Sequence, residues 1–451
     1  MLDVLIREAA VVAERVERAD IAIVEGKIVA VVAGIAEQAK ETIEAAGLHA
    51  FPGVIDSHVH FNDAGEHEGS RAHWEGAATG SAALAAGGGT LFCDMPLNSS
   101  PPTLTAAAFD AKRAACEKGS VTDFALWGGL TPGNLDHLEA LAQRGVIGFK
   151  AFMANSGMDD FPRADDLTLY RGMKIAARLG LPVALHAESE EITSRLAAEA
   201  ARSGRGMLDY LHSRPALAEI EATARAITLA EETGCSLHIV HVANARSAAL
   251  VRRARVNGWV AVTCETCPHY LALSEEDAER LGPCAKCAPP LRTLPEIEEL
   301  WRELAAGRFA FVASDHSPAP PGMKTSPDCF HCWGGISGVQ STLAVLLTRD
   351  PRLPLERVAK LTAGHVAARY RLPDKGAIAV GNDADIALVD LDARYELTRA
   401  MLLDRHQQSP YVGQTFRGRV ARTLLRGRTL FLEGKLVATG GGQFLRPAPA
   451  T

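Results

Sequence analysis

No part of this 451-residue sequence approaches the roughly 20 uninterrupted apolar residues that a membrane-spanning helix requires. The sequence also lacks a long run of Lys or Arg, and its formal net charge is −7, which argues against nucleic acid or an anionic membrane as a partner. Residues 1–7 carry charge early and lack the apolar stretch of a signal peptide. These absences predict a cytoplasmic protein.

The cysteines cannot all be paired with one another, because the chain contains nine of them. An odd number in a chain this long fits reduced thiols in a cytosol better than a disulfide framework. We therefore expect the fold to be stabilised by packing.

The length is sufficient for a large core and for more than one domain. Short β-prone stretches occur near both ends of the chain, at 2–6, 21–24, 27–32, 386–389, 420–425 and 429–432. Two β-rich ends around a different middle predict one small β-sandwich domain built from both termini, over 1–52 and 376–440. The chain ends with Gly440-Gly441-Gly442 and then two prolines, and we expect a mobile tail over 441–451.

The middle of the chain, 53–375, alternates β-type apolar runs with helical stretches such as 216–232 and 247–256. We expect strands at 54–58, 90–95, 122–127, 146–151, 182–186, 236–241, 259–264 and 309–314. Alternation at this spacing favours parallel βαβ units, and eight of them fit a closed barrel of about 250 residues or more. The predicted fold class is therefore α/β, a TIM-type (β/α)₈ barrel with the small β domain attached.

A His-x-His pair, His58 and His60, ends the first predicted barrel strand. Alternate residues of a strand point to the same side, so both imidazoles can face one metal ion. Alone, such a pair is more often a pair of surface or core histidines.

Other residues suited to a metal site stand at the ends of other predicted strands. These residues are Lys150, His186, His241 and Asp315. The carboxyl ends of barrel strands converge on one mouth, where active sites lie. Scattered core histidines would not all fall at strand ends. Four His, one Asp and one Lys there predict a metal centre.

Lys150 is the unusual member of this set, since an ammonium is not a metal ligand. It either pairs with a carboxylate at the mouth or reacts with CO₂ to form a carbamate. The carbamate is an anion with two oxygens that could bridge two cations, and burial would favour the neutral amine from which it forms.

Two ions that share a hydroxide would hold a strong nucleophile near neutral pH. Histidine ligands favour zinc, while the oxygen ligands leave manganese, cobalt or iron open. Asp315 could bind one metal, accept the proton of the attacking hydroxide and pass it to a leaving nitrogen, as a general base and then a general acid.

Several longer stretches carry a family resemblance. They are 56–63 (DSHVHFND), 94–99 (DMPLNS), 148–150 (GFK), 265–271 (ETCPHYL), 286–292 (KCAPPLR), 314–318 (SDHSP) and 333–338 (WGGISG). With them the sequence resembles the amidohydrolase superfamily, within it the cyclic amidohydrolases, and among these the allantoinase group. The stretches span most of the predicted barrel.

The resemblance implies a binuclear site in which His58, His60 and Asp315 hold one metal. It places His186 and His241 on the other, with carboxylated Lys150 and hydroxide bridging the two. It also implies hydrolysis of the hydantoin ring of allantoin to allantoate in purine breakdown, and a homotetramer.

Substrate contacts are expected from loops at the mouth, through Asn98, Ser317 and the backbone around Cys287 and Ser337. His316 and His269 are expected behind the metal ligands.

The sequence departs from the family after Asp63. The usual short link to Trp-Glu-Gly is replaced by 64–73, which is longer and brings two extra histidines. It is either a modified lid or a solvated insertion, since loops tolerate added length.

A competing interpretation comes from the cysteines, because Cys264-x-x-Cys267 and Cys284-x-x-Cys287 fall in the spacing range of a structural zinc site. Cys329-x-x-Cys332 adds a third pair. Two of these residues, Cys267 and Cys287, already belong to the family motifs, which argues against a zinc ribbon.

The alternative functions are D-hydantoinase (dihydropyrimidinase), dihydroorotase and an inactive scaffold related to dihydropyrimidinase. Dihydroorotase fits less well, because Asn62 stands where that enzyme has an Arg for the substrate carboxylate. A scaffold would be expected to lose metal ligands, and all six are present.

Overall fold

Both ends of the chain contribute strands to one nine-stranded sheet. The computed structural model describes residues 1–258 and 260–449. The strand order is β18-β17-β16-β15-β5-β1-β2-β3, with β4 paired to β1. The strands are β1 (Leu2–Val12), β2 (Val16–Val24), β3 (Lys27–Val32), β4 (Ala39–Glu44), β5 (His49–Pro52), β15 (Ile386–Glu396), β16 (Thr415–Leu425), β17 (Arg428–Leu432) and β18 (Lys435–Leu436).

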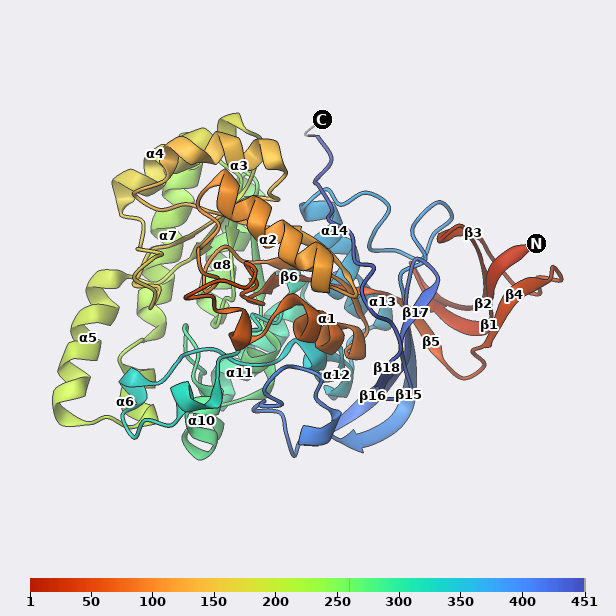
Figure 1. Cartoon of the computed structure of the whole chain (residues 1–451). Helices are drawn as coiled ribbons and strands as arrows, with labels where there is room; N and C mark the ends of the chain where they lie inside the picture. Colours follow the sequence, from red (N-terminus) through yellow and green to blue (C-terminus); the bar gives the residue numbers. More distant parts are fainter. Residues whose placement is uncertain (259, 450–451) are drawn as a thin grey trace.

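One buried core unites the two ends of the chain in this β domain. Ile6 and Ile21 from the N-terminal strands belong to the same apolar cluster as Ile386 and Leu424 from the C-terminal strands. The domain lies on the right in Figure 1, beside the barrel. The fold therefore agrees with the predicted β domain built from both termini.

The middle of the chain forms the predicted barrel. Its strands are β6 (Val54–Val59), β7 (Gly89–Asp94), β8 (Asp123–Leu126) continued by β9 (Gly128–Gly129), β10 (Phe149–Phe152), β11 (Val183–His186), β12 (Leu237–Ile239), β13 (Val262–Thr266) and β14 (Phe311–Val312). All pair in parallel, in the orders β6-β7-β8 and β9-β10-β11-β12-β13-β14. The predicted strand at 259–264 corresponds to β13, and its first residue lies outside the described residues.

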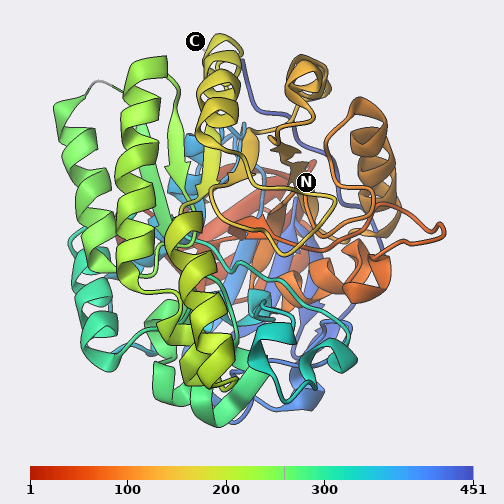
Figure 2. The ribbon, with the colours of Figure 1, turned by 90° about the vertical axis from the view of Figure 1, so that its left-hand side faces the viewer.

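The ends of the barrel sheet meet beyond β14. The His60 N–H donates to the His316 carbonyl at 2.8 Å, and Val59 forms a parallel bridge with His316. Strands β6 and β7 are buried along their whole length because a parallel sheet is covered on both faces. Figure 2 shows the helices, coloured yellow to green over α4 to α8, standing outside the strands.

The helices that cover the barrel follow the strands in alternation. They are α1 (Ala77–Ala86), α2 (Ala106–Gly119), α3 (Leu138–Arg144), α4 (Asp166–Arg178), α5 (Glu190–Ser203), α6 (Met207–His212), α7 (Ala216–Thr233), α8 (Ala245–Asn257), α9 (Pro268–Ala272), α10 (Glu275–Leu281), α11 (Leu294–Ala305), α12 (Thr342–Thr348), α13 (Leu355–Ala359) and α14 (His365–Arg369). In the described part of the chain, none of them has both the length and the apolar character to cross a membrane.

Capping residues determine where these helices begin. The Asn244 side chain accepts a hydrogen bond from the Ser247 N–H at 2.9 Å, and α8 ends at Gly258, whose φ is +71°. A side-chain cap satisfies an otherwise unpaired N–H, and glycine adopts the left-handed conformation without strain. The cap also fixes the short loop between β12 and α8, which carries His241.

Residues 442–448 lie along the barrel, where the sequence suggested a loose tail. The Phe124 N–H donates to the Gln443 carbonyl at 2.9 Å, and the Leu445 N–H donates back to the Phe124 carbonyl at 2.7 Å. The Phe444 ring packs against Phe109 and Phe124. This segment therefore adds to the barrel wall, while residues 450 and 451 of the suggested tail lie outside the described residues.

A buried ion cluster joins the barrel to the β domain. The Lys375 Nζ lies 2.7 Å from a carboxylate oxygen of each of Asp123, Asp383 and Asp385. Asp123 begins β8, and Asp385 directly precedes β15. The three carboxylates are close enough together to hold a metal ion, but the ammonium of Lys375 occupies the place between them.

Replacing Lys375 with Met should destabilise the fold by about 3–5 kcal/mol, because it removes the buried cation that Asp123, Asp383 and Asp385 share. Asp123 then keeps only Arg426 and Asp383 only Lys27 among the described cations. Lys27→Met is the matched control, since Lys27 pairs with Asp374 and Asp383 but its side chain is 40% exposed. An exposed pair contributes about 1 kcal/mol or less. Chemical denaturation of both variants measures the difference, and equal losses would contradict a special role for Lys375.

Candidate metal centre

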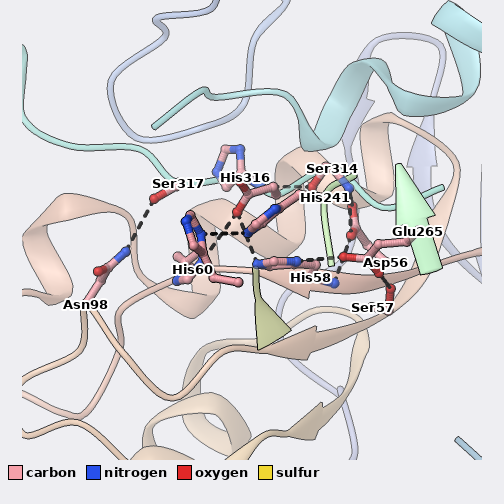
Figure 3. Close-up of polar contacts among 12 residues, drawn as sticks. Asp56, Ser57, His58, His60, Asn98, His241, Glu265, Ser314, His316 and Ser317 are labelled. Carbon is pink, nitrogen blue, oxygen red and sulfur yellow. Dashed lines mark hydrogen bonds and ion pairs between the residues drawn. The ribbon is translucent and has the colours of Figure 1, made fainter. Parts of the chain in front are cut away.

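The candidate ligands from the sequence converge at one end of the barrel. Five of them line one open cavity: His58, His60, His186, His241 and Asp315. Lys150, from β10, is fully buried beside them. The structure therefore brings together side chains from β6, β10 and β11 and from the loops after β12 and β14, and Figure 3 shows His58, His60 and His241 close together.

Three of these side chains form one compact group. The Asp315 Oδ1 lies 3.2 Å from the His58 Nε2 and 3.3 Å from the His60 Nε2. Ligand atoms at roughly 2.0–2.1 Å from a tetrahedral zinc ion lie about 3.3–3.4 Å apart. The spacing in the group matches that of ligands around a single ion, and the three residues form a candidate metal site by proximity.

His186 and His241 form a second group. The His186 Nδ1 lies 3.1 Å from the His241 Nε2, a spacing that again suits two ligands of one ion. Burial and the neighbouring charge of Lys150 hold the pKa of His241 well below its usual value, which keeps its imidazole neutral. The His58 and His241 ring centroids are 5.4 Å apart, so the two groups adjoin each other.

The backbone of two ligands is held in an unusual conformation. His241 and Asp315 have φ values of +39° and +46°. A residue other than glycine at such an angle costs about 1–3 kcal/mol, and strain of this kind clusters at functional sites. The buried Asp56 carboxylate supports the region, since its oxygens accept from the Ser314 N–H at 3.1 and 3.3 Å and from the His58 N–H at 3.2 Å.

In the described chain the Lys150 Nζ has no ion-pair partner, and it lies 4.7 Å from the centre of the Phe152 ring. Among the described residues its Nζ forms no hydrogen bond, and the side chain is fully buried. Burial lowers the pKa of Lys150 to about 7, so much of the amine is neutral at physiological pH. An orphaned, neutral amine between two groups of metal ligands fits the donor set that a carbamate and two ions would complete.

Comparison with known proteins identifies the family. The sequence matches the amidohydrolase family over residues 50–430. The chain belongs to the amidohydrolase family. It is therefore a hydrolase, as the sequence predicted, and the inactive scaffold considered above is not supported.

Individual relatives cover nearly the whole chain. An allantoinase of Solibacter usitatus is 56% identical over 96% of this chain and 94% of its own length. An allantoinase of Rubrobacter xylanophilus is 54% identical over 99% of this chain and 98% of its own length. The solved L-hydantoinase (dihydropyrimidinase) from Arthrobacter aurescens superposes with a TM-score of 0.94 at 33% identity, covering 99% of this chain and 100% of that one.

Glu265, in β13, contacts the ring of His58 on the side away from Asp315. Its Oε1 lies 2.7 Å from the His58 Nδ1, and its Oε2 accepts from the Ser57 hydroxyl at 2.9 Å (Figure 3). The same Oε2 lies 3.2 Å from the His238 Nε2. Burial raises the pKa of Glu265, but the hydrogen bonds from His238 and His58 outweigh it and hold the pKa well below its usual range. The carboxylate therefore fixes the ring of His58 with its Nε2 toward Asp315.

Glu188 has the same role for the second group. Its Oε2 lies 2.7 Å from the His186 Nε2, and both of its oxygens accept from the Arg214 guanidinium. Despite complete burial, the Arg214 charge and the His186 hydrogen bond lower the pKa of Glu188 to about 2. Neither Glu188 nor Glu265 was predicted from the sequence as a site residue, although Glu188 follows His186 at the same two-residue spacing as His60 follows His58.

The expected substrate contacts divide between two cavities. Asn98, Cys287 and Ser317 line the metal cavity, and the Asn98 Nδ2 lies 3.3 Å from the Ser317 Oγ (Figure 3). Ser337 lines a neighbouring cavity with His316, and its carbonyl accepts from the Ser409 hydroxyl at 2.7 Å.

His316 and His269, the histidines expected behind the metal ligands, lie in different surroundings. The His316 ring accepts from the Gly338 N–H at 3.1 Å and faces Glu75, away from the metal cavity. His269 is buried near Asp315, neither of its ring nitrogens has a hydrogen-bond partner in the described chain, and burial lowers its pKa to about 4.

The longer loop at 64–73 is anchored at its base and exposed at its tip. Arg71 pairs with Asp160 at 2.9 Å, and Trp74, just after the loop, packs edge-on against Trp333 of the cavity wall. The tip, 66–69, is exposed to solvent. The loop therefore borders the mouth of the cavity. Its histidines, His67 and His73, are not among the described residues that line the cavity.

The cysteine pairs do not form a metal site in the described chain. All nine cysteines are free thiols, and none belongs to a group of three or more potential ligands. Burial raises the pKa of Cys264, which disfavours the thiolate that zinc binding needs.

Glu265→Gln should lower metal affinity by about 10–100-fold, because the amide cannot accept as a carboxylate from both His58 and His238. Ser57→Ala is the matched control, as it removes one contact to Glu265 and leaves both histidine contacts in place. Competition with a chelator measures the affinity of each variant. An unchanged affinity in Glu265→Gln would show that Glu265 does not position the ligands.

Proposed function

We propose that this chain is an allantoinase, which hydrolyses the hydantoin ring of allantoin to allantoate in purine breakdown. The proposal rests on the complete set of six ligand residues at one barrel mouth, in a chain that matches allantoinases over nearly its full length. Hydrolysis of a cyclic amide breaks one ring C–N bond, and water supplies the oxygen of the new carboxylate and the proton taken up by the leaving nitrogen.

In this proposal His58, His60 and Asp315 hold one divalent ion, and His186 and His241 hold a second. Zinc suits the imidazole-rich set, and manganese, cobalt or iron would also fit its oxygen ligands. Ions bound there would supply Lewis-acid activation of the amide carbonyl and of water near neutral pH.

Lys150 would complete the site as a carbamate. Its neutral amine adds to the carbon of CO₂ and loses a proton, which gives an anion with two oxygens between the two groups of ligands. The lowered pKa of Lys150, about 7, and the absence of a hydrogen bond to its Nζ from the described residues support this assignment.

Asp315 is the proposed proton carrier. Although it is buried, the charge of His58 and the hydrogen bond from His60 lower its pKa to about 2, so it is ionised at neutral pH. It would accept the proton of the attacking water and deliver it to the leaving ring nitrogen. Asn98, Ser317 and the backbone at Cys287 line the same cavity and would contact the ring, while a contact from Ser337 stays a prediction.

The second candidate function is D-hydantoinase (dihydropyrimidinase) activity. The superposition on a solved L-hydantoinase (dihydropyrimidinase) at a TM-score of 0.94 favours it, since the two folds share the barrel and the β domain. The higher identity to allantoinases, 53–56% for three of them, favours allantoin as the substrate. A cytoplasmic location and a homotetramer stay predictions.

The metal-loaded protein should hydrolyse allantoin faster than hydantoin, dihydrouracil or dihydroorotate, because the pocket loops match the allantoinase pattern. Initial rates over a range of concentrations give kcat/KM for each compound. A kcat/KM for dihydrouracil or hydantoin that equals or exceeds the value for allantoin would contradict the allantoinase proposal and favour hydantoinase activity.

Lys150→Ala should lose both metal retention and allantoin hydrolysis, since it removes the proposed bridge. Short carboxylic acids added to this variant should restore part of both by filling the vacated space. Lys40→Ala, at an exposed lysine paired with Asp3, controls for the loss of a lysine elsewhere. Metal content after gel filtration and initial rates are measured together, and wild-type values in Lys150→Ala would refute the site.

A further inference from the structure

A second pocket adjoins the metal cavity on its outer side. The two share Asn155, Ser156, Ala288, Trp333 and Gly334 in their walls. The outer pocket encloses about 1210 Å³, including space open to solvent, against about 510 Å³ for the metal cavity. A molecule that leaves the metal cavity past these shared residues enters the outer pocket.

Lys286 lines this outer pocket and is 5% exposed. Its Nζ donates to the Cys332 carbonyl at 2.6 Å and lies 4.4 Å from the centre of the Tyr210 ring. In the described chain no carboxylate lies within ion-pair distance of it. The ammonium therefore has one hydrogen bond and one aromatic face, but no anion.

The other charges around the pocket are already paired. Arg214, on the same wall, is held by both oxygens of Glu188. The nearby Asp328 has one oxygen bonded to the Phe330 N–H at 2.9 Å and the other 3.2 Å from both Arg205 and His331. Lys286 is thus the cation of this wall that lacks a counter-charge, and burial lowers its pKa to about 8.

An uncompensated buried ammonium favours an anionic ligand, because the charge has lost water and gained little in exchange. The reaction proposed above converts an uncharged cyclic amide into a carboxylate, so the product is the anion that this chain itself generates. A carboxylate is also a good metal ligand. A cation outside the metal cavity would draw the product away from the ions.

We propose that the outer pocket is a binding site for the ring-opened ureido acid product, with Lys286 as its cationic contact. This inference rests on the proposed function, since it takes its ligand from that reaction. It gives the 286–288 segment two roles, because Cys287 faces the metal cavity and Lys286 faces the outer pocket.

The test uses the metal-loaded enzyme and allantoate as the probe. In Lys286→Gln, which keeps a donor for the Cys332 carbonyl but removes the charge, the inhibition constant of allantoate should rise about tenfold, the loss expected for a charge-assisted hydrogen bond. The KM for uncharged allantoin should stay unchanged. Lys286→Arg should restore product inhibition toward the wild-type value.

Lys174→Gln is the matched control, because Lys174 also lies over a tyrosine ring, at 5.3 Å from Tyr170, but on the exposed surface of α4. It should leave both constants unchanged. Calorimetry measures the affinity of the wild type and of each variant for allantoate without turnover. The affinities can therefore be compared even if allantoin is not the substrate.

Three results would overturn the product site. They are an inhibition constant for allantoate that is unchanged in Lys286→Gln, equally strong inhibition by acetate, and a wild-type enzyme that does not bind allantoate. A wild-type enzyme that binds allantoate but hydrolyses a different cyclic amide would overturn the proposed function instead.

Discussion

The parallel pairing of the barrel strands is the constraint on which the candidate site depends. Because every strand runs in the same direction, the ends of β6, β10, β11, β12 and β14 meet at one mouth. His58 and Asp315 are far apart in the sequence, yet their side chains lie 3.2 Å apart. The contact between His60 and the carbonyl of His316 joins the first and last strands and holds the site together at that point.

Burial at this mouth gives the ionisable groups the charges that metal binding needs. His60, His186 and His241 have lowered pKa values, which keeps their imidazoles neutral, as metal ligands must be. The carboxylates behind them stay ionised in spite of burial, because Glu265 and Glu188 each accept from ring nitrogens, and Glu188 also accepts from Arg214. Hydrogen bonds to the charged form lower the pKa of a buried carboxylate, and loss of water raises it. The hydrogen-bond partners therefore determine whether the carboxylate stays ionised.

Three buried lysines show how partners assign a role to one residue type. Lys375 lies among three carboxylates, which raise its pKa, and it joins the barrel to the β domain. Among the described residues Lys150 has no hydrogen-bond partner and lies over the Phe152 ring, and its pKa is about 7, which suits a reactive amine. Lys286 has one carbonyl and one aromatic ring, which leaves its charge available to an anion. The same side chain is a structural cation at Lys375, a proposed nucleophile at Lys150 and a proposed anion contact at Lys286, according to what surrounds it.

The sequence by itself determined the barrel, the β domain shared by both termini and the six metal-ligand candidates, because strand period and strand ends are properties of local sequence. Alternation of β runs and helices predicts parallel strands, and alternate polar residues at the ends of such strands are expected to face the mouth. Only the tertiary structure decided which nitrogen of His58 meets Glu265, that Glu188 supports His186, and that Ser337 lines a different cavity from Ser317. It also decided that 442–448 lies against the barrel and that Lys286 lacks the counter-charge that Lys375 has. These features depend on distances between segments remote in the chain, which packing sets and which no local pattern records.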